Sequence, residues 1–471
     1  MFKNYFITAY RNLRRNKAFS FLNIFGLTIG ITASILILEY VKFEKSYDQF
    51  HEKADDIYQV TTDYIIRGKK RYHMASTFAG VGPALKKELS EVKEYVKVYD
   101  AGSRHNYVVE AKKRIFKEKK LIFATEAFFQ VFSFPLIQGN PKIVLAQPNT
   151  VVISSTLAKK YFGNEDPVGQ TIIVKHGGFD DDLCKVTGVF EDIPENSHLK
   201  TEMVIAYKTL FKRTEEGQTG VDYYGNDWDY NRYHTYVLLD SKTNLTALTN
   251  RFPSLIDTYK PRYKALENGK RINVNHLILR PLTDIHFNKA DLTNDLEAGS
   301  NEQLIEFLQI IALFILLIAW VNYINLSTAQ AVNRAKEVGI RKLVGGVKSQ
   351  LIGQFLLEAL LLNFIAVVLA VLLADLLMPM FSELTGKVIR FTLWNNLSFA
   401  LGIIAMLLAG VLLSGLYPAF VLSSFEPVKV LKGKVGKVGK GFNLRKGLVV
   451  FQFATSVLFN MFAKYCELLL V

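Results

Sequence analysis

Residues 304–329 read LIEFLQIIALFILLIAWVNYINLSTA, an apolar run with a single acid near its start. About 20 apolar residues in a helix span the ~30 Å hydrocarbon core of a bilayer, so this run predicts a transmembrane helix. Three further runs qualify by the same measure, at residues 19–41, 351–380 and 396–420. A long polar stretch, residues 42–303, separates the first predicted helix from the other three.

Basic residues beside these runs set the expected orientation. Residues 1–18 carry lysines and arginines but no acid, and the segments 330–350 and 421–446 are also strongly basic. Basic segments stay on the cytoplasmic side of a membrane, so all three are expected inside. Residues 42–303 and the short link 381–395 are then outside. The sequence predicts an integral membrane α-helical protein with four transmembrane helices and a large extracytoplasmic domain.

The net charge of +14 would by itself raise nucleic acid as a partner. Residues 42–303, however, sum to only about +2, so the excess lies on the predicted cytoplasmic flanks. We therefore expect the basic flanks to interact with membrane lipids, and we expect no nucleic acid partner.

The N-terminal residues 1–18 predict a cytoplasmic amphipathic helix. Apolar residues including Phe6, Ala9 and Leu13 share one helical face, and the basic residues lie mostly elsewhere. Such a helix would lie in the headgroup plane. A poorly ordered basic tail is the alternative.

The polar stretch 42–303 alternates helix-like and strand-like segments, which indicates an α+β domain of two lobes. Helices are expected at 81–91 and 154–162, the second with Ser154 as its cap. Strands are expected at 107–109, 150–153, 171–174, 185–189, 233–239 and 274–279. Cys184 and Cys466 fall on opposite sides of the predicted membrane. The domain should therefore have no disulfide and depend on its core.

Motifs for chemistry are missing from the sequence. The glycines at 345–346 and 433–441 do not match the phosphate-binding Gly-x4-Gly-Lys-Ser/Thr pattern, so no ATP site is expected in this chain. All eight histidines lie within residues 42–303, without the short spacing of a zinc site. We expect no metal, no cofactor and no enzymatic activity.

Four polar residues stand out in the apolar runs: Asn322, Asn325, Gln354 and Glu358. Polar groups at membrane depth usually face other protein, so we expect contacts between helices. A proton or ion relay is the alternative, but it would need more such groups across the bilayer. Gly26 and Gly30 form a Gly-x3-Gly face suited to close helix packing.

The link between the second and third predicted helices gives the sharpest local signal. Residues 333–346 read NRAKEVGIRKLVGG, a short charged helix that the glycines are expected to break. This segment resembles the R-x-x-E-[IV]-G-I-R-[KR]-x-[LV]-G-[AG] pattern of the MacB/FtsX-like ABC transporter permease family. The resemblance continues along almost the whole chain, in RNLRRNK (11–17), NIFGL (23–27), SYDQFH (46–51), VFSFP (131–135), AKKYFG (158–163), DPVG (166–169), VTGV (186–189), NSH (196–198), PLTDIHF (281–287), NLST (325–328) and GLYPA (415–419). The style is that of large permeases of Bacteroidota-type bacteria.

The resemblance implies a mechanical role at a bacterial inner membrane. A separate cytoplasmic ABC ATPase dimer would bind the ATP, push the coupling segment and so move the periplasmic domain through the membrane helices. It implies that the coupling residues are Arg334, Lys336, Glu337, Gly339, Ile340, Arg341, Lys342, Gly345 and Gly346. A periplasmic adaptor is a further possible partner. The alternative for the charges is a simple topology signal.

The chain departs from the family pattern near its C-terminus. Residues 447–471 begin a fifth apolar run, a marginal partial helix whose last dozen residues do not resemble the family. We expect a truncated permease that lacks its second half, with a half-permease that pairs with a second copy as the alternative. A membrane sensor or scaffold with a periplasmic binding domain is a different reading of the same architecture.

Overall fold

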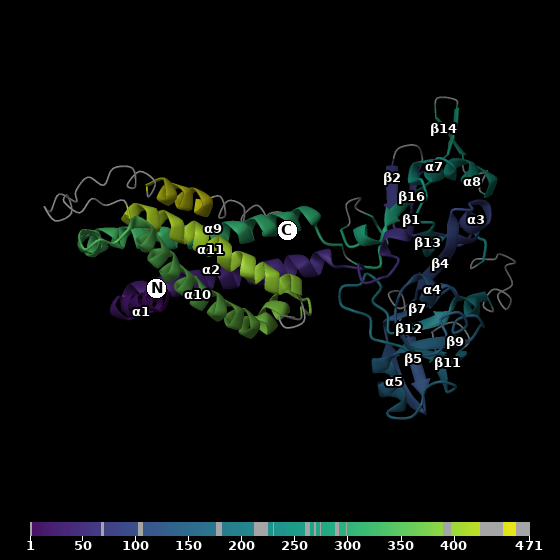
Figure 1. The fold of residues 1–471 in the computed structure, drawn as a ribbon. Coiled ribbons are helices and arrows are strands. Elements are labelled where there is room, and N and C mark those ends of the chain that lie inside the picture. Colours follow the sequence, from purple (N-terminus) through teal and green to yellow (C-terminus); the bar gives the residue numbers. More distant parts are fainter. Residues whose placement is uncertain are drawn as a thin grey trace. The chain divides into compact units, whose positions relative to one another are not determined.

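The computed structural model divides the chain into two compact units (Figure 1). The membrane unit comprises Met1–Phe43 and Gln303–Val471, and the outer domain is Glu44–Glu302. The structure describes residues 2–66, 70–101, 107–175, 181–211, 225–228, 230–259, 264–267, 270–273, 275–287, 292–297, 299–389, 397–423 and 446–457. Most of the expected basic linker (424–445), part of the external link (390–396) and the end of the fifth run (458–471) lie outside these residues.

The membrane unit is built from long helices. They are α1 (Phe2–Arg15), α2 (Lys17–Lys45), α9 (Glu302–Leu343), α10 (Lys348–Thr385) and α11 (Leu397–Ser423), followed by a shorter apolar helix, Lys446–Val457. Four of them, α2, α9, α10 and α11, are long and apolar enough to cross a membrane, as the sequence predicts. At 1.5 Å per residue, α9 and α10 are about 60 Å long, roughly twice the hydrocarbon thickness.

Side chains from α2, α9, α10 and α11 form one apolar cluster in this unit. It includes Leu27 and Ile31 of α2, Trp320 of α9 and Leu362 of α10, with Ile403 of α11 packed against it. The predicted close approach at the Gly-x3-Gly face is confirmed. A Cβ on Gly30 would lie 2.7 Å from Ala319 Cβ, and one on Gly26 would lie 3.5 Å from Asn322 Nδ2.

The outer domain is organised around one large mixed sheet of 14 strands. The strands are β1 (Ile57–Ile66), β2 (Lys70–Met74), β3 (Thr77–Phe78), β4 (Val92–Asp100), β5 (Tyr107–Ala111), β6 (Arg114–Glu118), β7 (Leu121–Ala124), β8 (Leu136–Gln138), β9 (Thr150–Ser154), β10 (Thr171–Lys175), β11 (Asp182–Phe190), β12 (Met203–Ala206), β13 (Asn231–Leu239) and β16 (Asn275–Pro281). A hairpin, β14 (Lys264–Glu267) and β15 (Lys270–Asn273), stands apart from the sheet. The main path runs β16-β1-β13-β4-β7-β12-β9-β11-β10-β5-β6.

Strand pairing in this sheet is antiparallel except for β9 with β11 and β7 with β12. Because hydrogen bonds connect the path from β16 to β6, the expected two lobes do not form separate sheets. The α-helices that the structure describes in this domain are α3 (Val81–Glu88), α4 (Phe128–Val131), α5 (Ser155–Phe162), α7 (Leu245–Thr249) and α8 (Phe252–Tyr259).

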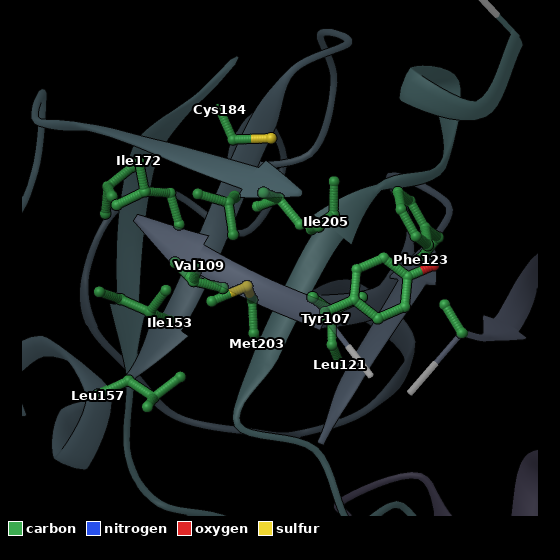
Figure 2. Close-up of a cluster of buried hydrophobic side chains, with 14 of the residues drawn as sticks. Tyr107, Val109, Leu121, Phe123, Ile153, Leu157, Ile172, Cys184, Met203 and Ile205 are labelled. Atoms are coloured by element: carbon green, nitrogen blue, oxygen red, sulfur yellow. The ribbon is translucent and has the colours of Figure 1, made fainter. Parts of the chain in front are cut away.

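The local predictions for this domain hold well. Each predicted strand lies in or overlaps β5, β9, β10, β11, β13 or β16. The predicted cap is also present, since the Ser154 hydroxyl accepts a hydrogen bond from the Leu157 amide at 3.2 Å. Figure 2 shows part of the core, where Phe123, Ile153 and Met203 lie among apolar side chains of neighbouring strands. Cys184 is buried in the same cluster.

Candidate functional site

The predicted coupling segment lies where α9 ends and α10 begins. Helix α9 runs without a break through Gly339 to Leu343, so the expected short helix broken at that glycine is not present. Because the apolar run of the sequence ends at Ala329, α9 extends beyond it by about 20 Å. The turn at residues 344–347 therefore lies at the tip of a helical hairpin.

Two glycines shape this tight turn. Gly345 has a φ of +93°, a conformation that residues with a Cβ rarely adopt. The Gly346 amide donates to the Arg341 carbonyl at 2.9 Å, and a Cβ on Gly346 would lie 2.9 Å from the same oxygen. The two glycines thus end α9 and allow α10 to start at Lys348, as the sequence-based reading of a bend expects.

Apolar side chains cover the tip of this hairpin. Val344 is 84% exposed, Leu343 59%, and Ile340 and Val347 54% each. Beneath the tip, the buried Val338 of α9 packs with Leu351 and Phe355 of α10 and Ala419 of α11. An exposed apolar group on a well-packed support is typical of a surface that binds another protein.

Two of the predicted polar residues hold elements together near this tip. The Arg341 guanidinium donates to the Gln354 side-chain oxygen, which joins the end of α9 to the first turns of α10. One turn further along α10, Glu358 accepts a hydrogen bond from Asn12 Nδ2 of α1 at 2.8 Å. Both α10 residues are buried. Gln354 and Glu358 therefore act as contacts between helices.

The N-terminal helix forms as expected, but part of its apolar face contacts protein. Ala9 is buried, and Leu13 packs against the apolar cluster of the bundle. Together with the Asn12–Glu358 bond, these contacts attach α1 to the end of α10 near the hairpin tip. Arg11 and Arg14 lie on the exposed side of α1.

The remaining predicted site residues do not take part in the tip contacts described above. Asn322 lies opposite Gly26 of α2, whereas the buried Asn325 Oδ1 has no hydrogen-bond partner among the described residues. Lys342 is half-buried in the last turn of α9. Arg334, Lys336 and Glu337 are in α9 by their backbone, but their side chains lie outside the described part of the chain.

A second polar cluster, in the outer domain, was not predicted as a unit. Glu44 Oε2 lies 2.6 Å from His286 Nε2, and each side chain is only 1% exposed. The Tyr47 ring stacks on the His286 ring at 3.4 Å between centroids. The Tyr47 hydroxyl also donates to Glu297 Oε1 at 3.3 Å. Burial, and then the charges of Glu297 and Glu44, raise the pKa of Tyr47 well above its ordinary value, which keeps it a donor.

Asp48 continues this cluster into the sheet. Its carboxylate lies 2.9 Å from His198 Nδ1 and accepts a hydrogen bond from the Ser197 hydroxyl at 3.1 Å. His198 Nε2 lies 2.8 Å from the Tyr236 hydroxyl of β13. Burial would raise the pKa of Asp48, but His198 and then His51 hold it below its ordinary value. Burial lowers the pKa of His51 to about 4.

The sequence held a signal for this cluster. Four of its residues, Tyr47, Asp48, His198 and His286, come from three of the motifs that carry the family resemblance, SYDQFH (46–51), NSH (196–198) and PLTDIHF (281–287), whereas Glu44 and Glu297 lie outside these motifs. Each motif by itself indicates only the family, and its histidine lacks the short spacing of a zinc site. Nothing local in the sequence indicates that the three meet. We call Glu44, Tyr47, Asp48, His198, His286 and Glu297 the neck network.

Comparison with protein families covers both units. Residues 20–255 match the MacB-like periplasmic core domain, and residues 309–427 match the FtsX-like permease C-terminal family. The first match spans about half of the chain, and the two follow in the order expected for a permease.

Curated relatives are distant in sequence. The macrolide export ATP-binding/permease protein MacB of Bdellovibrio bacteriovorus is 24% identical over 60% of this chain and 38% of its own length. The pyoverdine export ATP-binding/permease protein PvdT of Pseudomonas syringae is 25% identical over 64% of this chain and 41% of its own length. A probable export ATP-binding/permease protein of Pseudomonas fluorescens is 23% identical over 92% of this chain and 60% of its own. The chain thus spans about two fifths of the length of the first two.

Solved structures resemble about half of this chain. A domain of a permease protein from Porphyromonas gingivalis is 22% identical and covers 55% of this chain and 99% of its own, with a TM-score of 0.38. The periplasmic region of MacB from Actinobacillus actinomycetemcomitans is 15% identical and covers 48% of this chain and 89% of its own, with a TM-score of 0.33.

Proposed function

Because the chain belongs to the MacB/FtsX-like family of ABC transporter permeases, we propose that it couples ATP hydrolysis by a separate ATPase to movement of its periplasmic domain. The chain would lie in the inner membrane with its N-terminus in the cytoplasm. An ABC ATPase dimer would bind the tip of the α9–α10 hairpin. Movement of the hairpin would drive export or extraction of a substrate on the periplasmic side.

The observation that carries this proposal is the exposed apolar tip, Ile340, Leu343, Val344 and Val347, about 20 Å beyond the apolar run of α9. Exposed valine and leucine side chains at the end of a helical hairpin are suited to a hydrophobic pocket on a partner. Basic residues around the tip favour the cytoplasmic side. Lys342, one of the charged residues that the family pattern assigns to coupling, lies directly before Leu343 of this tip.

The structure supports a path from the tip to the rest of the bundle. Arg341 connects α9 with α10 through Gln354, and Glu358 connects α10 with α1 through Asn12. A push on the tip would therefore move three helices together. ATP would be bound only by the partner, and the bundle would be completed by a second copy of the chain or by a second half. Family membership favours this role over the alternative of a sensor or scaffold.

Co-purification tests the proposal. The tagged chain is expressed in its native host, solubilised in mild detergent, and the captured proteins are identified. We expect the wild type to capture a P-loop ATPase. Val344→Asp should reduce capture tenfold or more, because a charge in the centre of a protein interface costs about 2 kcal/mol or more. Glu337→Ala tests the charged contact that the family pattern implies.

Val388→Asp is the matched control. Val388 is 55% exposed and follows the C-terminal end of α10, at the opposite end of that helix from the tip. This variant should insert into the membrane and capture the ATPase as the wild type does. Equal capture by Val344→Asp and the wild type would contradict docking at the tip. Good insertion without any captured ATPase would contradict the proposed function itself.

A further inference from the structure

The two units are joined by the chain at two points. The first connection is Phe43–Glu44, in the last turn of α2, and the second is Glu302–Gln303, at the first residues of α9. Any movement that the backbone carries from the membrane helices into the outer domain must pass through these two connections. The residues just after the first connection and just before the second therefore determine how a movement of the helices is transmitted to the outer domain.

The neck network contains residues next to both connections. Glu44 and Tyr47 come directly after the first, and His286 and Glu297 come shortly before the second. Glu44 contacts His286 at 2.6 Å, and Tyr47 contacts both His286 and Glu297. Within the outer domain, the outgoing and returning segments are thus bound to each other through side chains more than 200 positions apart.

The network is also attached to the sheet. Asp48 has a φ of +57°, which turns the chain sharply after α2 and aims its carboxylate at Ser197 and His198. His198 then contacts Tyr236 of β13, a central strand of the sheet. A positive φ at a residue other than glycine persists only when its surroundings fix it, and these contacts do so.

Burial makes this arrangement stiff. The side chains of Asp48 and His198 are fully buried, and those of Glu44 and His286 are 1% exposed. Separating a buried pair leaves a charged or polar group without a partner in a medium of low dielectric, which is strongly unfavourable. Few alternative arrangements are therefore accessible to the two segments.

We propose that the neck network is the joint that fixes the end of α2 and the segment leading into α9 to each other and to the sheet, so that they move the outer domain as one body. His286 is its central positioning residue, because it touches Glu44, Tyr47 and Glu297 at once. That ATP hydrolysis causes the movement rests on the proposed function. That the neck network connects the two segments and the sheet does not depend on it.

The first experiment measures backbone hydrogen exchange of the full chain in lipid nanodiscs without nucleotide. His286→Ala should raise exchange tenfold or more at residues 44–51 and 196–198 together, while the core strands β9 and β12 stay protected. His286→Gln, which retains a donor for Glu44, should restore most of the protection. Asp240→Asn is the control, because it breaks an exposed pair with Lys93 at 2.7 Å and should change nothing in these segments.

A milder variant keeps the test valid if His286→Ala loses the fold of the domain. Tyr47→Phe removes only the hydroxyl that donates to Glu297 and keeps the stack on His286. It should raise exchange about threefold at residues 292–297 and at the end of α2. In either variant, faster exchange only in the segment after α2, or only in the segments that contact it, would contradict the proposal that the network joins them.

The second experiment adds the captured ATPase and compares exchange with and without ATP. The wild type should show an ATP-dependent change at residues 44–51 and 285–287 and in the sheet. Folded His286→Ala should hydrolyse ATP at the wild-type rate and lose the change in the sheet, and His286→Gln should regain it. An undiminished change in the alanine variant would overturn the joint. If no ATPase is captured, the proposed function fails, and the first experiment still decides the joint.

Discussion

Helix α2 of the membrane unit and the neck network of the outer domain both bury polar side chains, but they satisfy them with different kinds of partner. In the membrane unit, hydroxyls of α2 donate to backbone carbonyls: Thr28 to Ala366, Thr32 to Ala370 and Ser34 to Ala312. In the outer domain, buried carboxylates face histidine rings, as in Glu44 with His286 and Asp48 with His198.

This difference matters for movement. Backbone carbonyls recur along every helix, so a hydroxyl that loses one can reach another after a small shift, and such contacts contribute little each. A buried carboxylate of the neck network depends on the few donors fixed around it, and losing them is costly. We infer that α2 can slide slightly against α9 and α10, whereas the neck network holds one arrangement.

The largest effect should follow removal of the Asp48 carboxylate. Asp48→Ala leaves His198 and Ser197 without their buried acceptor and places a Cβ-only residue at a φ of +57°. We expect the outer domain to lose about 3–5 kcal/mol of stability. Asp48→Asn should cost clearly less, since asparagine tolerates this conformation and keeps an acceptor. The urea dependence of hydrogen exchange in β9 and β12 measures the free energy of unfolding of both variants. An equal loss of stability in Asp48→Ala and Asp48→Asn would contradict the proposed role of this side chain as an acceptor.

Acid should weaken the outer domain through His51. Its pKa is about 4 in the fold, below the ordinary value of 6.5, so the unfolded chain binds more protons between these limits. Stability is therefore complete above pH 6.5 and is lost as the pH falls toward 4, by about 2 kcal/mol at pH 5.

His51→Asn tests this assignment, because its side-chain oxygen can accept from the Ser133 amide as His51 Nδ1 does at 3.0 Å. The variant should lose less stability than the wild type between pH 8 and pH 5. The same slope in His51→Asn would show that another group is responsible.

A smaller effect is expected at the closest helix contact of the membrane unit. Gly30→Ala places a methyl group 2.7 Å from Ala319 Cβ, which forces α2 and α9 apart and should cost about 1–3 kcal/mol. Gly402→Ala in α11 meets no atom within 4 Å and should be neutral. Thermal unfolding of the detergent-solubilised chain compares the two, and equal midpoints would mean that α2 and α9 can separate freely.

The smallest effect should come from the hydroxyl contacts. Thr28→Val and Thr32→Val each remove one donor to an α10 carbonyl while keeping the shape of the side chain. Each should cost about 0.6 kcal/mol. A loss of several kcal/mol in the same thermal unfolding assay would mean that the hydroxyl contacts of α2 are as important for stability as the carboxylate–histidine contacts of the neck network.

Much of this architecture could be read from the sequence, because its signals are local. Four apolar runs gave the membrane helices, and Ser154 gave the start of α5. Several strands were missed, including the long strands β1 and β4. Of the short ones, β7 and β12 have four residues each, all buried, so they show no alternation. The helix through Gly339 was also missed, because a single glycine weakens a helix only modestly when its surroundings pack well.

The candidate site was predicted only where its features are local in the sequence. The turn glycines Gly345 and Gly346 were visible as a local pattern. The exposed apolar tip around Val344 was not, since an isolated valine in a basic segment says nothing about its exposure. The Asp48–His198 contact joins positions 150 apart and follows only from the register of the sheet and the turn after α2.

The place of the outer domain between α2 and α9 has a consequence for biogenesis. Once α2 is in the membrane, about 260 residues must be synthesised and exported before α9 emerges. At ribosomal rates this takes on the order of 10–50 s. During that interval Gly30 has no Ala319 to pack against, and Ser34 has no Ala312 carbonyl. A nascent α2 would therefore be a substrate for membrane chaperones and quality-control proteases until its partner helix arrives.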